Sequence, residues 1–108
     1  MSITWGNYSF DGPYQITGWN PPYRSAVYAI MKKASEPNSY TIIYFGESEN
    51  LSERGFISSH HKYSCFIDEA GAESNLYIGI YLMPNSTQEE RQAVESKLVS
   101  KYNPACND

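Results

Sequence analysis

Residues 40–46 have the sequence YTIIYFG, and the β-branched and aromatic side chains of this run predict a β-strand that ends at a glycine. Residues 25–32 (SAVYAIMK) predict a second strand just before it. The segment between the two is polar and contains Pro37 and Asn38. We therefore expect the two strands to form an antiparallel hairpin with an enlarged loop.

The second half of the chain begins with a weak helical pattern and a strong strand pattern. Helical character starts near Leu51 and continues unevenly to Ala70, where Gly71 ends it. Residues 75–83 (NLYIGIYLM) are an almost continuous apolar run. Such a run predicts a central strand that is buried on both faces.

The last predicted element is the clearest helix of the chain. Ser86 or Thr87 can cap it, since each is followed three residues later by a glutamate. Apolar side chains recur every four residues from Val94 to Tyr102, and Pro104 ends the helix. The element order strand, strand, helix, strand, helix predicts an α+β fold, with a small three-stranded, mainly antiparallel sheet flanked by helices.

The N-terminal residues 1–24 are rich in aromatic side chains and are interrupted by turn formers such as Gly12-Pro13. This pattern predicts an extended arm without regular secondary structure. The arm would pack on the domain formed by residues 25–108, so that the chain is a single domain overall. The packing side chains would be Trp5, Phe10, Tyr14 and Trp19.

The composition is that of an ordinary globular protein, with 108 residues, 41% hydrophobic and 19% charged. Its unusual feature is the count of 10 tyrosines, which fits a polar cleft or an interaction surface as well as half-buried strand positions. The 8 basic and 12 acidic residues give a net charge of −4. Because nucleic-acid binders gain most of their affinity from basic residues, this charge argues mildly against tight, autonomous DNA binding.

The cysteines and the termini suggest a compartment. Two cysteines, Cys65 and Cys106, are too few for a disulfide framework and lack metal-binding spacing, so we expect reduced thiols. The first residues have neither a basic nor an apolar stretch, and no apolar run is long enough to span a membrane. The expected location is therefore cytoplasmic.

Four local signatures in this order resemble the GIY-YIG nuclease superfamily. Residues 26–28 (AVY) stand for Gly-Ile-Tyr, and residues 44–46 (YFG) stand for Tyr-Ile-Gly. Arg54 follows eight residues later at the position of the family's helix-borne arginine. Glu95 precedes Asn107 by twelve residues, which is similar to the family's closing pattern. The literal trigrams YIG and GIY overlap within residues 77–81, which we interpret as core strand.

The resemblance implies a metal-dependent endonuclease that hydrolyses phosphodiester bonds, with DNA preferred over RNA. Glu95 would hold one Mg²⁺ or Mn²⁺ ion, whose preference for oxygen suits a carboxylate, waters and phosphate. Tyr28 would be the general base that activates water, and Tyr44 would support it or contact phosphate. Arg54 would grip the scissile phosphate with its planar fork. Gly46 would permit an unusual backbone conformation and close approach of the substrate.

One position departs from the family pattern. Four residues after the arginine the family has His or Tyr, whereas this chain has Ser58. His60, His61 and Lys62 follow, and a histidine from this pair could act in proton transfer. We prefer His61 as the catalytic one, with His60, Lys62 and Asn107 as substrate contacts.

The sequence is also compatible with other functions. Ser58 and the acidic charge motivate a catalytically inactive module that binds nucleic acid or protein. If the chain is active, a partner protein could supply its DNA affinity, or the N-terminal aromatic residues could stack on unpaired bases. A cysteine hydrolase is weaker: His61 and Cys65 could meet on a helix, but nothing marks the thiol as activated.

Overall fold

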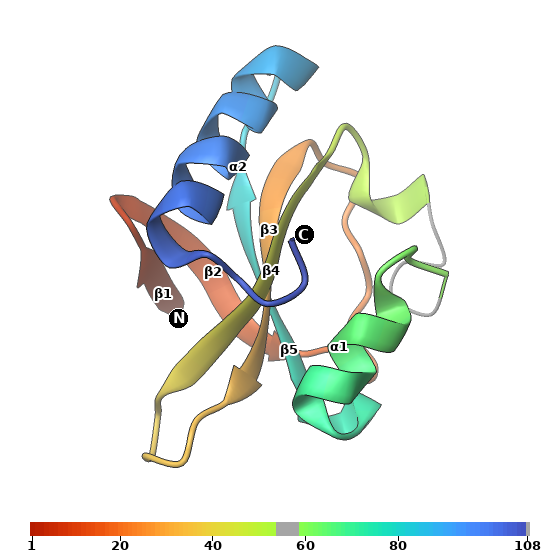
Figure 1. Cartoon of the computed structure of the whole chain (residues 1–108). Helices are drawn as coiled ribbons and strands as arrows, with labels where there is room; N and C mark the ends of the chain where they lie inside the picture. Colours follow the sequence, from red (N-terminus) through yellow and green to blue (C-terminus); the bar gives the residue numbers. More distant parts are fainter. Residues whose placement is uncertain (54–58, 108) are drawn as a thin grey trace.

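The computed structural model describes residues 1–53 and 59–107 (Figure 1). Five strands form one antiparallel sheet in the order β1-β2-β5-β3-β4. The strands are β1 (Ser2–Trp5), β2 (Tyr8–Gln15), β3 (Ala26–Lys33), β4 (Tyr40–Ser48) and β5 (Leu76–Leu82). The helices are η1 (Leu51–Glu53), α1 (Tyr63–Ala70), η2 (Glu73–Asn75) and α2 (Gln88–Tyr102). The predicted α+β class and element order after residue 25 are confirmed.

Strand β3 lies between β4 and β5, and side chains on its two faces enter two separate cores. Along β3, alternate side chains point to opposite faces of the sheet. Tyr28 and Ile30 join the core that includes Phe66 of α1. Val27 and Ala29 join the core that includes Leu98 of α2. The two helices therefore cover opposite faces of the sheet, as Figure 1 also shows.

The N-terminal arm is a correction to the sequence-based prediction. Residues 2–15 form the hairpin β1–β2 and extend the sheet from three strands to five, because β2 pairs with β5. The turn between the strands contains Gly6, whose φ of 62° is a conformation that glycine adopts without steric cost. Trp5 and Phe10 are buried, as expected of the arm, whereas Tyr14 is largely exposed.

The two α-helices differ in how well their sequences specify them. Thr87 caps α2 with a full capping box, since its side chain accepts from the Glu90 amide and Glu90 accepts from the Thr87 amide. The predicted helix from Leu51 is only partly realised, because η1 covers three residues and α1 begins at Tyr63. Gly71 ends α1, as predicted from the sequence, and it adopts the left-handed conformation.

The cysteines are not reduced, which corrects a second prediction. Cys65 of α1 and Cys106 of the C-terminal tail form a disulfide, with their Cα atoms 5.9 Å apart. The cysteine-hydrolase alternative is therefore wrong for this structure, because neither sulfur is a thiol. Protein disulfides persist mainly in oxidising compartments, so the bond also removes the support that cysteine usage gave to a cytoplasmic location.

Within residues 1–53 and 59–107, no helix has the length and apolar character that crossing a membrane requires.

Candidate functional site

Tyr28 is the centre of a buried cluster on the α1 face of the sheet. Its side chain is only 3% exposed, and its hydroxyl oxygen lies 2.8 Å from Nε2 of His60. Tyr44, two strand positions before Gly46, stands edge-on to His60 with ring centroids 5.1 Å apart. We call Tyr28, Tyr44 and His60 the tyrosine–histidine cluster. Phe66 of α1 packs against both Tyr44 and His60.

The hydrogen bonds of His60 define its tautomer. Nδ1 of His60 accepts a hydrogen bond from the backbone N–H of Lys62 at 3.0 Å, so this nitrogen carries no proton. A neutral His60 must then carry its proton on Nε2 and donate it to the oxygen of Tyr28. The Lys62 amide, at the N-terminal cap of α1, therefore orients a ring that lies in the site.

The two neighbouring histidines occupy different environments. His60 is 5% exposed and bonds Tyr28, whereas His61 is exposed and stacks on His60 with ring centroids 4.6 Å apart. The geometry thus favours His60 over His61 as the partner of Tyr28. The sequence-based preference for His61 finds no support in these contacts.

Gly46 is a glycine because of Tyr28. The two residues are paired across β3 and β4, and the Tyr28 ring lies over the Gly46 backbone. A Cβ built at position 46 would collide with the Tyr28 ring and hydroxyl, and would also press on the Tyr44 ring. The φ angle of Gly46 is not in the left-handed region, so the expected unusual backbone conformation is wrong. The missing Cβ makes room for the Tyr28 side chain.

A charged cluster lies on the opposite face, where α2 covers the end of β4. Arg91 of α2 donates from Nε to Oε1 of Glu47 at 2.9 Å, and the two side chains are only 4% and 13% exposed. Glu95, one helical turn after Arg91, is half-buried. Burial raises the pKa of the Glu95 carboxyl above its ordinary value, and the negative charge of Glu47 raises it further. We call Glu47, Arg91 and Glu95 the carboxylate–arginine cluster.

Two consecutive residues of β4 connect the clusters. On one face of the sheet, Gly46 lies against the Tyr28 hydroxyl. On the other face, the negative charge of Glu47 raises the pKa of Glu95. The two clusters therefore lie on opposite sides of the end of strand β4. Sequence reasoning missed Glu47 and Arg91. The available signals were the position directly after Gly46 and the four-residue spacing from Arg91 to Glu95.

The Glu95 carboxylate suits one hard divalent cation. A half-buried carboxylate supplies the oxygen ligands that Mg²⁺ and Mn²⁺ prefer. Within the described part of the chain, no group of three or more His, Cys, Asp or Glu side chains could hold a metal ion. The residues therefore fit an ion bound through one carboxylate, with waters and substrate as its other ligands.

Asn107 and the tail have contacts within the protein. The Asn107 amide accepts from the Phe45 N–H and donates to the Phe45 carbonyl, both at 2.9 Å. The Cys106 amide donates to the carbonyl of Ile43. These bonds attach the tail to β4, so the described contacts of Asn107 are with the strand. Its predicted role in substrate binding remains a prediction.

Arg54 and Ser58 lie outside the described residues. Their predicted roles, as the phosphate clamp and as the departure from the family pattern, are unchanged by the structure. The backbone N–H of Lys62 bonds His60 of this cluster, and the predicted role of Lys62 in substrate binding remains a prediction.

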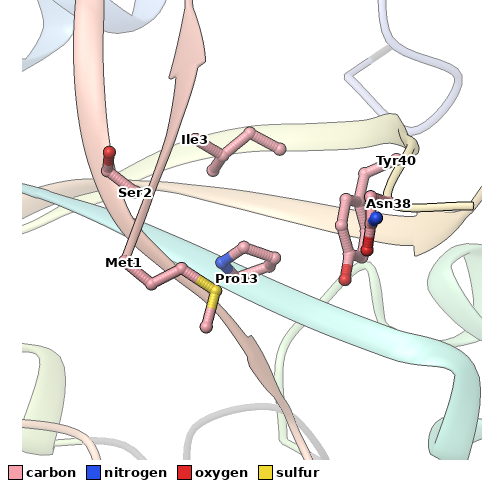
Figure 2. A pocket seen from close by; sticks show the side chains of 6 residues that line it. All are labelled: Met1, Ser2, Ile3, Pro13, Asn38 and Tyr40. Carbon is pink, nitrogen blue, oxygen red and sulfur yellow. The ribbon is translucent and has the colours of Figure 1, made fainter.

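A pocket of about 270 Å³ lies away from both clusters, between the N-terminal hairpin and the β3–β4 loop (Figure 2). Gly46 lies six positions after Tyr40 of the pocket along β4, which corresponds to about 20 Å. Its lining has no Asp, Glu, His, Lys or Arg side chain: the residues are Met1, Ser2, Ile3, Pro13, Asn38 and Tyr40. The pocket therefore lacks the side chains that phosphodiester chemistry needs.

Comparisons with known proteins identify the fold. No protein-family model and no curated protein sequence matches the chain. A solved structure that matches is the GIY-YIG N-terminal endonuclease domain of UvrC from Thermotoga maritima, a point mutant bound to its catalytic divalent cation. The identity is 23% and the TM-score 0.51, over 82% of this chain and 87% of that chain. The chain therefore has the fold of a GIY-YIG nuclease domain.

Proposed function

We propose that this protein is a metal-dependent nuclease that hydrolyses phosphodiester bonds, with DNA as the preferred substrate. One observation supports the proposal above all others: the buried 2.8 Å hydrogen bond between the Tyr28 hydroxyl and His60, on a nuclease fold. A tyrosine on a strand is commonplace. A buried tyrosine whose hydroxyl is held by a histidine and whose ring needs a glycine beneath it is a specific arrangement.

In the proposed reaction, Tyr28 acts as a phenolate, which accepts the proton of the attacking water and becomes a phenol. A phenol has an ordinary pKa of about 10, so it is a poor base at neutral pH unless its anion is stabilised. The Nε2–H of His60 donates to the phenolic oxygen and favours that anion. The Lys62 amide holds His60 in the required tautomer. His60, rather than His61, is thus the proposed partner of the base.

The reaction also requires that the negative charge building up on the phosphate is neutralised. A cation bound at Glu95 would supply positive charge where negative charge builds on the phosphate oxygens. Arg54, predicted from the sequence alone, would add a bidentate contact to the same group. Tyr44 packs edge-on against His60 and would help to hold its ring in place.

A bound metal ion would also explain how a chain with negative net charge binds DNA. The ionised Glu95 would repel a phosphate, and the whole chain carries a charge of −4. A bound cation reverses the local sign at Glu95. This dependence predicts that DNA affinity, and not only cutting, requires the divalent ion. The described residues add no support for a partner protein, which stays outside the proposal.

A nicking assay tests the proposal. Supercoiled plasmid, nicked duplex and single-stranded DNA are incubated with the protein in Mg²⁺ or Mn²⁺, and Glu95→Gln is compared with Glu89→Gln on the same helix. Glu89 is exposed in the first turn of α2, so it controls for the loss of one helix charge. We expect Glu95→Gln to lose about 100-fold or more of the activity and Glu89→Gln to keep it.

If the wild-type protein leaves all three DNA forms intact with both metals, the nuclease proposal is wrong. The alternative, a catalytically inactive module of this fold that binds nucleic acid or protein, would then stand. If the wild type cuts and Glu95→Gln cuts as fast, the metal assignment is wrong.

A further inference from the structure

Arg91 has two possible partners among the acids near it. Glu95 follows it by four residues on α2, a spacing at which oppositely charged side chains on a helix reach each other. The guanidinium instead bonds Glu47 on β4 at 2.9 Å. Its Nη1 donates to the backbone carbonyl and the hydroxyl of Ser86, at 2.8 and 2.9 Å. The strand and the helix N-terminus together direct Arg91 away from Glu95.

Both oxygens of Glu47 are engaged in this arrangement. Oε1 accepts from Arg91, and Oε2 accepts from the Gln88 side chain at 3.4 Å. Glu47 is therefore poorly placed to be a metal ligand itself. Within the described residues, Glu95 has neither an ion pair nor a hydrogen bond from its side chain. The neighbouring acid is neutralised, and the acid proposed to bind the cation is left unneutralised.

We propose that Glu47 is a positioning residue that holds Arg91 away from Glu95 and so keeps the Glu95 carboxylate available to a divalent cation. This inference rests on the proposed function, since it takes Glu95 as the metal ligand. Without Glu47, the buried guanidinium of Arg91 would be left unpaired, which is costly. Glu95 lies four residues after Arg91 on the same helix, within reach of its side chain, and would become its partner. Cation binding would then compete with an internal ion pair.

We expect a single substitution at Glu47 to weaken Mn²⁺ binding and a second substitution at Arg91 to restore it. Glu47→Gln keeps the shape of the side chain, releases Arg91 and removes a negative charge near the cation. We expect it to weaken Mn²⁺ binding by about tenfold or more, a size typical of residues that position metal ligands. The double variant Glu47→Gln with Arg91→Met removes the competitor as well. We expect its Mn²⁺ affinity to return to within about threefold of the wild type, as a coupling between the two sites requires.

Mn²⁺ binding is measured without DNA, from the loss of the free-ion signal in electron paramagnetic resonance. Circular dichroism melting of each variant controls for folding. A structural role alone would lower affinity along with melting temperature in both variants, whereas the inference predicts recovery in the double variant. If Glu47→Gln does not fold, Glu47→Asp, which keeps the charge and shortens its reach, replaces it with the same expected direction.

Two results overturn the inference while the proposed function stands: Glu47→Gln binding Mn²⁺ within about twofold of the wild type, or the double variant remaining as weak as the single one. If the wild type binds no Mn²⁺ and cuts no DNA, the proposed function fails and the inference fails with it.

Discussion

The tyrosine–histidine cluster and the carboxylate–arginine cluster meet at the same two residues of β4, yet they are built in different ways. The first consists of aromatic rings, and its central hydrogen bond joins Tyr28 to His60 from distant parts of the chain. The second consists of full charges, and two of its three members lie one turn apart on α2. One cluster fixes positions through packing and the other through charge.

The two clusters should respond differently to substitution of their residues. A packed aromatic group tolerates little change in volume, because neighbouring rings leave no space for it. An ion pair tolerates changes in volume but not the removal of one charge, since the partner remains buried and unpaired. Mutations at the first cluster should therefore act mainly through geometry, and mutations at the second through electrostatics.

We expect the largest effect on DNA nicking from substitution of His60 and little effect from substitution of its neighbour His61. His60→Phe keeps the ring packing against Tyr44 and Phe66 but removes the hydrogen bonds to Tyr28 and to the Lys62 amide. We expect about a 100-fold loss of DNA nicking or more, the usual size of a lost proton-transfer partner. His61→Phe is the matched control and should keep activity within about threefold. The reverse pattern, with His61 essential and His60 dispensable, would restore the sequence-based preference.

The next effect tests packing at Gly46. Gly46→Ala places a methyl group against the Tyr28 ring, so the ring must move. We expect the free energy of unfolding to fall by about 1–3 kcal/mol, with a clear loss of nicking. Chemical denaturation measures the first quantity.

Removal of the ring gives the control for Gly46→Ala. In a Tyr28→Ala background the added methyl group no longer meets the phenol, so the second substitution should cost much less than it does in the wild type. Equal costs in the two backgrounds would mean that the close fit between Gly46 and Tyr28 is not what excludes a Cβ.

Local sequence signals predicted one part of this molecule well. Strands β3, β4 and β5 and helix α2 begin and end within two residues of the predicted bounds, because their signals are local: β-branched runs, a capping box at Thr87 and a proline after the helix. The hairpin β1–β2 was missed although Gly6-Asn7, between apolar Trp5 and Tyr8, is a typical two-residue turn. The many other turn formers of residues 1–24 obscured it.

The remaining features depend on contacts between distant segments. The resemblance to the family gave Tyr28 and Glu95, but choosing between His60 and His61 requires the path of the chain before α1. The Cys65–Cys106 disulfide joins residues 41 positions apart, which a count of two cysteines does not predict. The Glu47–Arg91 pair joins a strand to a helix across 44 positions. Such pairings are set by tertiary packing and not by spacing along the chain.

Reduction of the disulfide should affect the first cluster more than the second. The bond ties α1, which carries Phe66, to the tail, whereas α2 is held by its own contacts. For a loop of this length, we expect reduction to lower the free energy of unfolding by about 3–4 kcal/mol. Nicking should slow, and Mn²⁺ affinity should stay unchanged. Urea denaturation with and without reductant tests this prediction. Two alkylatable thiols in the unreduced native protein would contradict it.

The smallest expected effect concerns the Glu95 charge itself, measured without metal. Its folded-state pKa is raised above the ordinary value of 4.5, by burial and by Glu47. The folded protein therefore binds this proton more tightly than the unfolded chain does. The stability that results is complete below the unfolded-state pKa and is lost as the pH rises through the folded-state pKa.

At pH 7 the ionised Glu95 thus costs stability, and Glu95→Gln should raise the free energy of unfolding by up to about 1 kcal/mol, discounted for its partial exposure. The gain should shrink as the pH falls and disappear below the unfolded-state pKa, where the wild type is protonated as well. Glu89→Gln, at an exposed position on the same helix, should show no such gain. Added Mn²⁺ should reverse the order at pH 7, because the ion stabilises only the folded protein that binds it. If Glu95→Gln is less stable than the wild type at pH 7 without metal, Glu95 has a stabilising partner. The carboxylate–arginine cluster would then be an ion-pair network instead of a site left available to a cation.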